Sequence, residues 1–201
     1  SNPYDFRTEV ADDIRLYAKW TADTYAVEYD KNTADSVAVP SGQTKKHDSV
    51  LVLSPQIPVR TGYTFAAWNT KPDGTGTSYG AGSELSVNAD ITLYAQWRIN
   101  KFAVSLITGE GVTGTLSANE AAYNETVRVT ALSGDGYSSP VITAIPQENA
   151  ELISEGVYRI LGPVSFIAAA EAKKIYTANF YLDGRLYYTQ SAIDGDGLTV
   201  A

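Results

Sequence analysis

Residues 60–97 read RTGYTFAAWNTKPDGTGTSYGAGSELSVNADITLYAQW. This stretch opens on Gly-Tyr-Thr-Phe-Ala-Ala-Trp (62–68), carries an Asp-Gly pair in its middle and closes on Ile-Thr-Leu-Tyr-Ala-Gln-Trp (91–97). Asp-Gly is a favoured turn pair, and the alternation of apolar and polar residues at the end is typical of a half-buried strand. The stretch therefore predicts short strands joined by tight turns.

The end of this stretch occurs twice in the chain. Residues 10–20 read VADDIRLYAKW and residues 87–97 read VNADITLYAQW, with identical residues at seven aligned positions. A fixed spacing between similar segments indicates a tandem repeat. Fainter copies follow, because Gly136-Tyr137 resembles Gly62-Tyr63 and residues 176–180 share the pattern of residues 25–29.

This spacing predicts four segments, listed in chain order: the C-terminal tail of a truncated repeat (1–20), a complete repeat (21–97), a diverged β-rich module (98–174) and the start of a further truncated repeat (175–201). Only four residues separate Trp20 from Tyr25, which is too short for a flexible linker, so we expect the modules to abut in an elongated arrangement. The opening Ser1-Asn2 resembles the remnant of a removed tag, so we expect an excised fragment.

Composition narrows the classes of function. The hydrophobic content of 44% predicts packed cores, and the absence of cysteine excludes disulfides and thiolate chemistry. A formal net charge of −8 disfavours nucleic acid as a partner, because its phosphates would be repelled. No apolar run approaches the length of a transmembrane helix, so we expect no membrane insertion by this fragment.

Residues suited to catalysis or metal binding are few. The single histidine, His47, stands in the polar run 44–48, which we interpret as a solvated loop. Asp194-Gly-Asp196-Gly begins like a calcium-binding loop but lacks the later ligands. Residues 117–122 are the one stretch that reads as a candidate helix. We therefore predict no catalytic residue, no metal and no cofactor.

The motif of residues 58–79, closed by residues 90–97, resembles the Listeria–Bacteroides repeat, also known as the B repeat of internalin-type surface proteins. This resemblance implies a β-rich (α+β) fold of tandem β-grasp-like repeat modules. It also implies a bacterial cell-surface or secreted protein, located outside the cell, with no enzyme activity. Residues 98–174 depart from the motif, since the position of Trp68 falls near Ile142 and that of Trp97 on Ala170.

The aromatic residues of the motif allow two interpretations. We predict that the motif residues fill the core of each module: Gly62, Tyr63, Phe65, Trp68, Leu93, Tyr94 and Trp97. The alternative is a ligand platform, since exposed aromatic rings stack on sugars and peptides. Tyr187 and Tyr188 are the candidates for such binding.

Three functions follow from these observations. The first is a structural spacer that contributes to adhesion and packs against neighbouring repeats of its parent chain. The second is a carbohydrate- or protein-binding module that uses exposed tyrosines or edge strands, with a protein or glycan partner that the sequence does not identify. The third is part of an enzyme whose catalytic residues lie outside these 201 residues.

Overall fold

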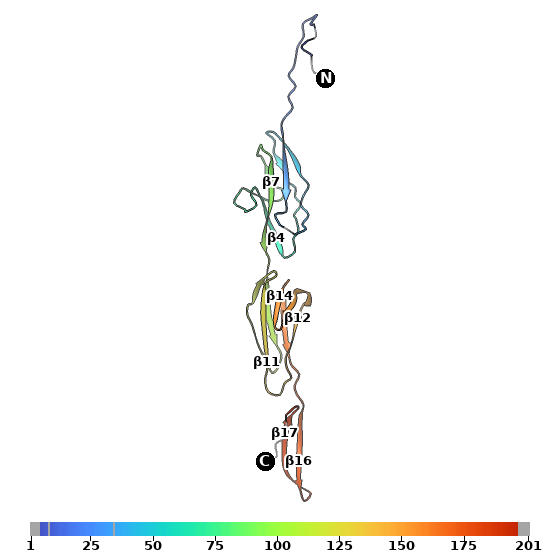
Figure 1. Ribbon diagram of the computed structural model, residues 1–201, viewed down its shortest axis with the longest axis vertical. Helices are drawn as coiled ribbons and strands as arrows, with labels where there is room; N and C mark the ends of the chain where they lie inside the picture. The colour runs from blue at the N-terminus through green and yellow to red at the C-terminus, as the bar shows by residue number, and fades with distance from the viewer. Residues whose placement is uncertain (1–4, 8, 34, 197–201) are drawn as a thin grey trace. The chain divides into compact units, whose positions relative to one another are not determined.

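The computed structural model describes residues 5–7, 9–33 and 35–196, and strands dominate this part of the chain (Figure 1). Its one helical element is a single 3-10 turn, η1 (Gln147–Asn149). The predicted β-rich class is confirmed. The helix predicted at residues 117–122 is wrong, because Glu120–Ala122 forms a strand whose central residue, Ala121, is buried.

The chain divides into two compact units. The first comprises Ser1–Pro58 and Phe65–Gln96, and the second comprises Val59–Thr64 and Trp97–Ala201. The strands that lie wholly or mostly in the first unit are β1 (Thr24–Asp30), β2 (Gln43–Lys46), β3 (Leu51–Val52), β4 (Tyr63–Asn69), β5 (Ser78–Tyr79), β6 (Glu84–Leu85) and β7 (Ile91–Ile99).

The first unit is built on a five-stranded sheet in the order β2-β1-β7-β4-β5. β1 pairs antiparallel with β2 and parallel with β7, while β3 and β6 form a small separate sheet. Burial alternates along β1, as expected for a strand with one face toward a core. The fully buried apolar residues of this unit are Val27, Leu53, Trp68, Leu85, Leu93 and Ala95.

The second unit contains two four-stranded sheets, in the orders β10-β8-β15-β12 and β13-β14-β11-β9. Their strands are β8 (Lys101–Thr108), β9 (Val112–Leu116), β10 (Glu120–Ala122), β11 (Thr126–Ser133), β12 (Val141–Ile145), β13 (Ala150–Ser154), β14 (Val157–Ile160) and β15 (Val164–Ala169). In the core between these two sheets, the ring centres of Tyr158 and Phe166 lie 4.5 Å apart in tilted geometry. Burial raises the pKa of the Tyr158 phenol.

The five-stranded sheet of the first unit and the sheet β10-β8-β15-β12 of the second share a strand order. In each, an early antiparallel pair (β1 with β2, β8 with β10) is followed by a parallel pairing of the first strand with the last (β1 with β7, β8 with β15). A strand from the middle of the segment, β4 or β12, then lies next to that last strand. The diverged segment thus keeps this order although it contains no tryptophan. The predicted boundaries of the four segments stay a prediction.

A hairpin of β16 (Ile175–Leu182) and β17 (Arg185–Ile193) forms a two-stranded sheet of its own (Figure 1). Asp183 and Gly184 make its turn, with φ of 49° and 75°. Two successive positive φ angles are what a tight two-residue hairpin requires, and Asp-Gly is a favoured pair for such a turn.

Replacing Trp68 with alanine should lower the free energy of unfolding of the first unit by about 3–5 kcal/mol, because a large cavity replaces a fully buried ring. Trp20→Ala is the matched control, since Trp20 is 90% exposed and its loss should change that free energy by no more than about 0.5 kcal/mol. Urea unfolding followed by circular dichroism measures both. Equal effects of the two substitutions would contradict this assignment of the core.

Candidate functional site

The aromatic cluster of the first unit is packed inside the protein. Trp68 lies with its ring centre 4.8 Å from that of Tyr29 and 5.0 Å from that of Phe65, in edge-on or tilted geometry. The Nε1 atom of Trp68 has no hydrogen-bond partner among the described residues. Leu93 is fully buried, and Tyr94 beside it on β7 is half-buried. With Trp68 enclosed, its ring is unavailable as a stacking platform for a ligand.

Tyr29 links this cluster to a polar contact. Its hydroxyl donates to Gln43 Oε1 at 2.6 Å and accepts from the Ser54 N–H at 3.0 Å. Burial raises the pKa of the Tyr29 phenol, and the Ser54 N–H opposes that rise because it stabilises the ionised form. The phenol therefore serves as a neutral anchor for two segments, β2 and the chain after β3.

The start of the motif packs through a second set of aromatic rings. The Arg60 guanidinium lies 3.7 Å from the centre of the Tyr63 ring and 5.8 Å from the centre of the Trp97 ring, so Arg60 stacks on an aromatic face. Gly62 has φ of 76°, and a Cβ there would lie 2.0 Å from the Tyr123 ring. Both the backbone angle and the close approach of Tyr123 therefore require glycine at this position.

A polar cluster surrounds Lys45, which is only 1% exposed. The interpretation of residues 44–48 as a solvated loop is wrong for this residue, because Gln43–Lys46 is strand β2. Lys45 Nζ donates to Asn88 Oδ1 at 2.6 Å and to the Lys46 carbonyl at 3.2 Å. Asn88 in turn donates to Asp48 Oδ1 at 2.7 Å and accepts from the Asp48 N–H at 3.1 Å.

The hydrogen bonds of this cluster connect β2 to the chain just before β7. His47, beside it, bonds the Tyr25 hydroxyl at 2.8 Å and lies 3.3 Å from Asp48. No group of three or more His, Cys, Asp or Glu side chains suited to a metal ion occurs among the described residues. The sequence offers one signal for the burial of Lys45: in a strand, Lys45 points to the opposite face from its neighbours Thr44 and Lys46.

The predicted binding pair Tyr187 and Tyr188 lies on β17. Tyr187 is 77% exposed, while the Tyr188 ring packs at 5.7 Å from that of Phe180. Adjacent residues of a strand point to opposite faces, so the two rings do not form a joint platform. Tyr187 alone borders a shallow hollow of about 450 Å³, together with Leu182, Asp183, Arg185 and Leu186.

Comparison with known proteins finds a family model that matches one part of the chain. The family model described as the Listeria–Bacteroides repeat domain matches residues 25–96, which confirms the resemblance inferred from the motif. No solved structure matches the chain significantly. In the described residues, no helix is long and apolar enough to cross a membrane.

Three curated relatives are similar to the chain. A protein named as a Gly-rich membrane protein of Evansella cellulosilytica is 38% identical over 119 residues, covering 58% of this chain and 14% of the relative. A second, named as a membrane protein of the same organism, is 33% identical over 156 residues, covering 75% of this chain and 23% of the relative. Internalin H of Listeria monocytogenes is 35% identical over 103 residues, covering 48% of this chain and 17% of the relative. The chain thus spans less than a quarter of the length of each.

Substituting Gly62 with alanine should lower the free energy of unfolding by about 1–3 kcal/mol, because a positive φ is strained in alanine and the Tyr123 ring must move. Gly82→Ala measures the cost of the positive φ alone, since Gly82 has φ of 75° but an added Cβ would lie 3.8 Å from the nearest atom. Gly80→Ala should be nearly neutral, because it has neither constraint. Thermal unfolding measures the series, and an equal effect at positions 62 and 80 would refute the role given to Gly62.

Proposed function

We propose that the chain is a non-catalytic spacer segment of a bacterial surface protein, because residues 25–96 match the model of the Listeria–Bacteroides repeat. The observation that carries this proposal is that the motif residues pack against other residues of the protein. Trp68, Phe65 and Leu93 support the core of the first unit, and Tyr63 packs under Arg60. A motif whose side chains are used to pack its own unit fits a structural module.

The architecture proposed here is a series of β-grasp-like modules in tandem, strung in an elongated arrangement. Two features support it: the strand order β2-β1-β7-β4 occurs again as β10-β8-β15-β12, and one residue, Asn100, separates β7 from β8. A connection of one residue restricts the freedom of successive strands. Repeated modules with short connections would lengthen a protein without contributing catalytic or binding residues.

A location outside the bacterial cell is part of the proposal. Its support is that similar proteins are named as membrane proteins or as an internalin, and that each is more than four times as long as the part matched here. In proteins of that size, a spacer would hold another domain away from the cell surface. Contacts made by the spacer itself would then contribute to adhesion.

A second candidate function rests on a separate observation. Tyr187 is largely exposed beside a hollow, and exposed tyrosines are common in surfaces that bind glycans and proteins. This role would be favoured over the spacer role if a glycan or protein bound the chain and Tyr187→Ala abolished that binding. Tyr176→Ala would be the matched control, because Tyr176 is also exposed on the hairpin but lies outside that hollow.

Small-angle X-ray scattering tests the spacer proposal. A compact chain of this length would have a radius of gyration of about 16–17 Å, and an elongated spacer should give a clearly larger value. The measured value should stay constant across a dilution series, so that self-association is excluded as its cause. A monomer with the compact radius would contradict the spacer role.

A further inference from the structure

Lys45 is a buried amine at a position where the corresponding strand pair of the second unit has an alanine. Lys45 lies opposite Tyr25 in the β1–β2 pair. In the β8–β10 pair, Ala121 lies opposite Phe102 and is equally buried. Both pairs close with a bond from the N–H of the residue after the second strand to the carbonyl of the residue before the first, which fixes this alignment.

Asn88, the partner of Lys45, is also replaced in the second unit. The parallel pairings align Ile91 with Val164, because each starts the last strand of its sheet. Three residues earlier stand Asn88 in the first unit and Leu161 in the second. The amine and the amide therefore occur together in one unit and are absent together from the other.

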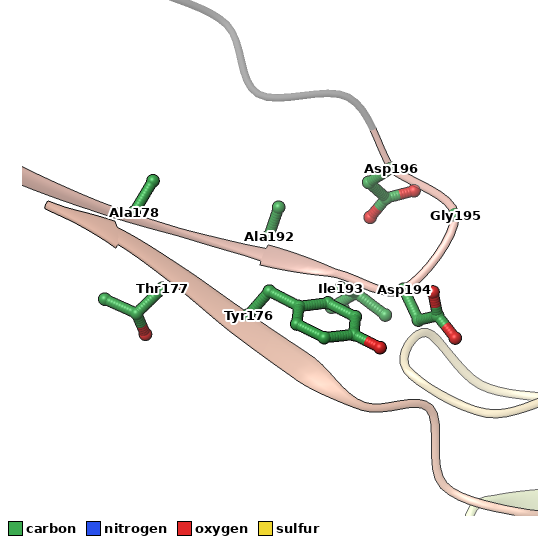
Figure 2. A pocket seen from close by; sticks show the side chains of 8 residues that line it. All are labelled: Tyr176, Thr177, Ala178, Ala192, Ile193, Asp194, Gly195 and Asp196. Carbon is green, nitrogen blue, oxygen red and sulfur yellow. The ribbon is translucent and has the colours of Figure 1, made fainter.

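The β16–β17 hairpin gives a second comparison. It closes with the same bond, from the Asp194 N–H to the Lys174 carbonyl at 2.7 Å. Ala192 lies opposite Tyr176 at the position of Lys45, and both line the hollow in Figure 2. Pairing of the two strands thus does not require a lysine, and a lysine is rarely buried without a specific partner. The burial of Lys45 needs a separate explanation.

Lys45 Nζ is held against the carbon of the Asn88 amide. Nζ lies 2.6 Å from Asn88 Oδ1. A carbonyl bond is about 1.23 Å long, so Nζ lies no more than about 3.8 Å from Asn88 Cγ. Reacting atoms in near-attack geometry are about 3–3.5 Å apart. A small rotation of the lysine side chain therefore brings a neutral amine within attacking distance of Cγ.

Asp48 contacts both ends of the same amide. Its backbone N–H donates to Asn88 Oδ1 at 3.1 Å, where it would stabilise the negative charge that develops on oxygen during attack. Its carboxylate accepts from Asn88 Nδ2 at 2.7 Å, next to the nitrogen that has to leave. A carboxyl group at this place can deliver a proton to the leaving nitrogen. The Asp48 side chain is 78% exposed, so released ammonia has a path to water.

We propose, independently of the spacer role, that Lys45 and Asn88 form an intramolecular isopeptide bond. The neutral Lys45 amine attacks Asn88 Cγ, so that a bond from Nζ to Cγ forms and the bond from Cγ to Nδ2 breaks. The proton lost by Nζ reaches Nδ2 through the Asp48 carboxylate, and Nδ2 leaves as ammonia. One amine and one amide become one substituted amide and one ammonia molecule, so the step balances without an oxidant or a reductant.

This bond would connect two segments that the polar cluster already holds together. Lys45 is on β2, and Asn88 precedes β7 by two residues. The bond would close the chain from residue 45 to residue 88 into a covalent loop. The β1–β7 pairing would then be held by a covalent bond as well as by packing and hydrogen bonds.

Mass spectrometry of the purified, folded chain tests the proposal. The measured mass should be lower than that of the sequence by one ammonia molecule. Trypsin should release a branched peptide that joins residues 32–46 to residues 61–98, because it does not cleave at the modified Lys45 or between Lys71 and Pro72. A succinimide at Asn88 would also lose one ammonia molecule, but it gives no branched peptide.

Three variants complete the test. Lys45→Arg should keep the full sequence mass, and so should Asp48→Asn, which suits the positive φ of 53° but cannot carry the proton. Lys46→Arg, at the exposed neighbouring position, should give the branched peptide in wild-type yield. Circular dichroism checks that each variant is folded.

Two results for the folded wild-type chain would overturn the proposal: the full sequence mass, or loss of ammonia without the branched peptide. These results decide even where Lys45→Arg does not fold. A wild-type yield of branched peptide from Asp48→Asn would overturn the proposed proton transfer.

Discussion

The parallel pairing of β1 with β7 is the contact on which the first unit depends. It brings Val27 opposite Ile91 and so joins the first and last strands of the unit across the whole intervening chain. Closing so long a loop costs conformational entropy, which the burial of Val27, Leu93 and Trp68 offsets. The pairing of β8 with β15 does the same in the second unit, with Val104 opposite Val164.

This mode of closure uses the largest side chains of the first unit for packing. The large aromatic residues pack against one another, and the most deeply buried charged group, Lys45, is held by an asparagine and a carbonyl. Those contacts order β2 against the chain that leads into β7. Lys45 therefore helps to join β2 to the chain that leads into β7.

Much of this arrangement could be predicted from the sequence because it depends on local pattern. The alternation in residues 91–97, the Asp183-Gly184 turn and the carboxylate of Asp90 before the closing strand are each readable over a few residues. The burial of Lys45 was missed because it depends on Asn88, which is remote in the sequence. Trp20 and Trp97 end nearly identical segments, yet Trp20 is 90% exposed, because exposure is decided by the partner strand and not by the segment itself.

Native-state amide hydrogen exchange tests most directly whether the β1–β7 pairing closes the repeat. The central amides of β1 and β7, such as those of Tyr29 and Leu93, should exchange together and only through global unfolding of the unit. Amides of β16, which lacks a parallel partner in the described chain, should exchange far faster in dilute protein. Fast exchange in β1 or β7, or protection in β16 equal to theirs, would contradict the account.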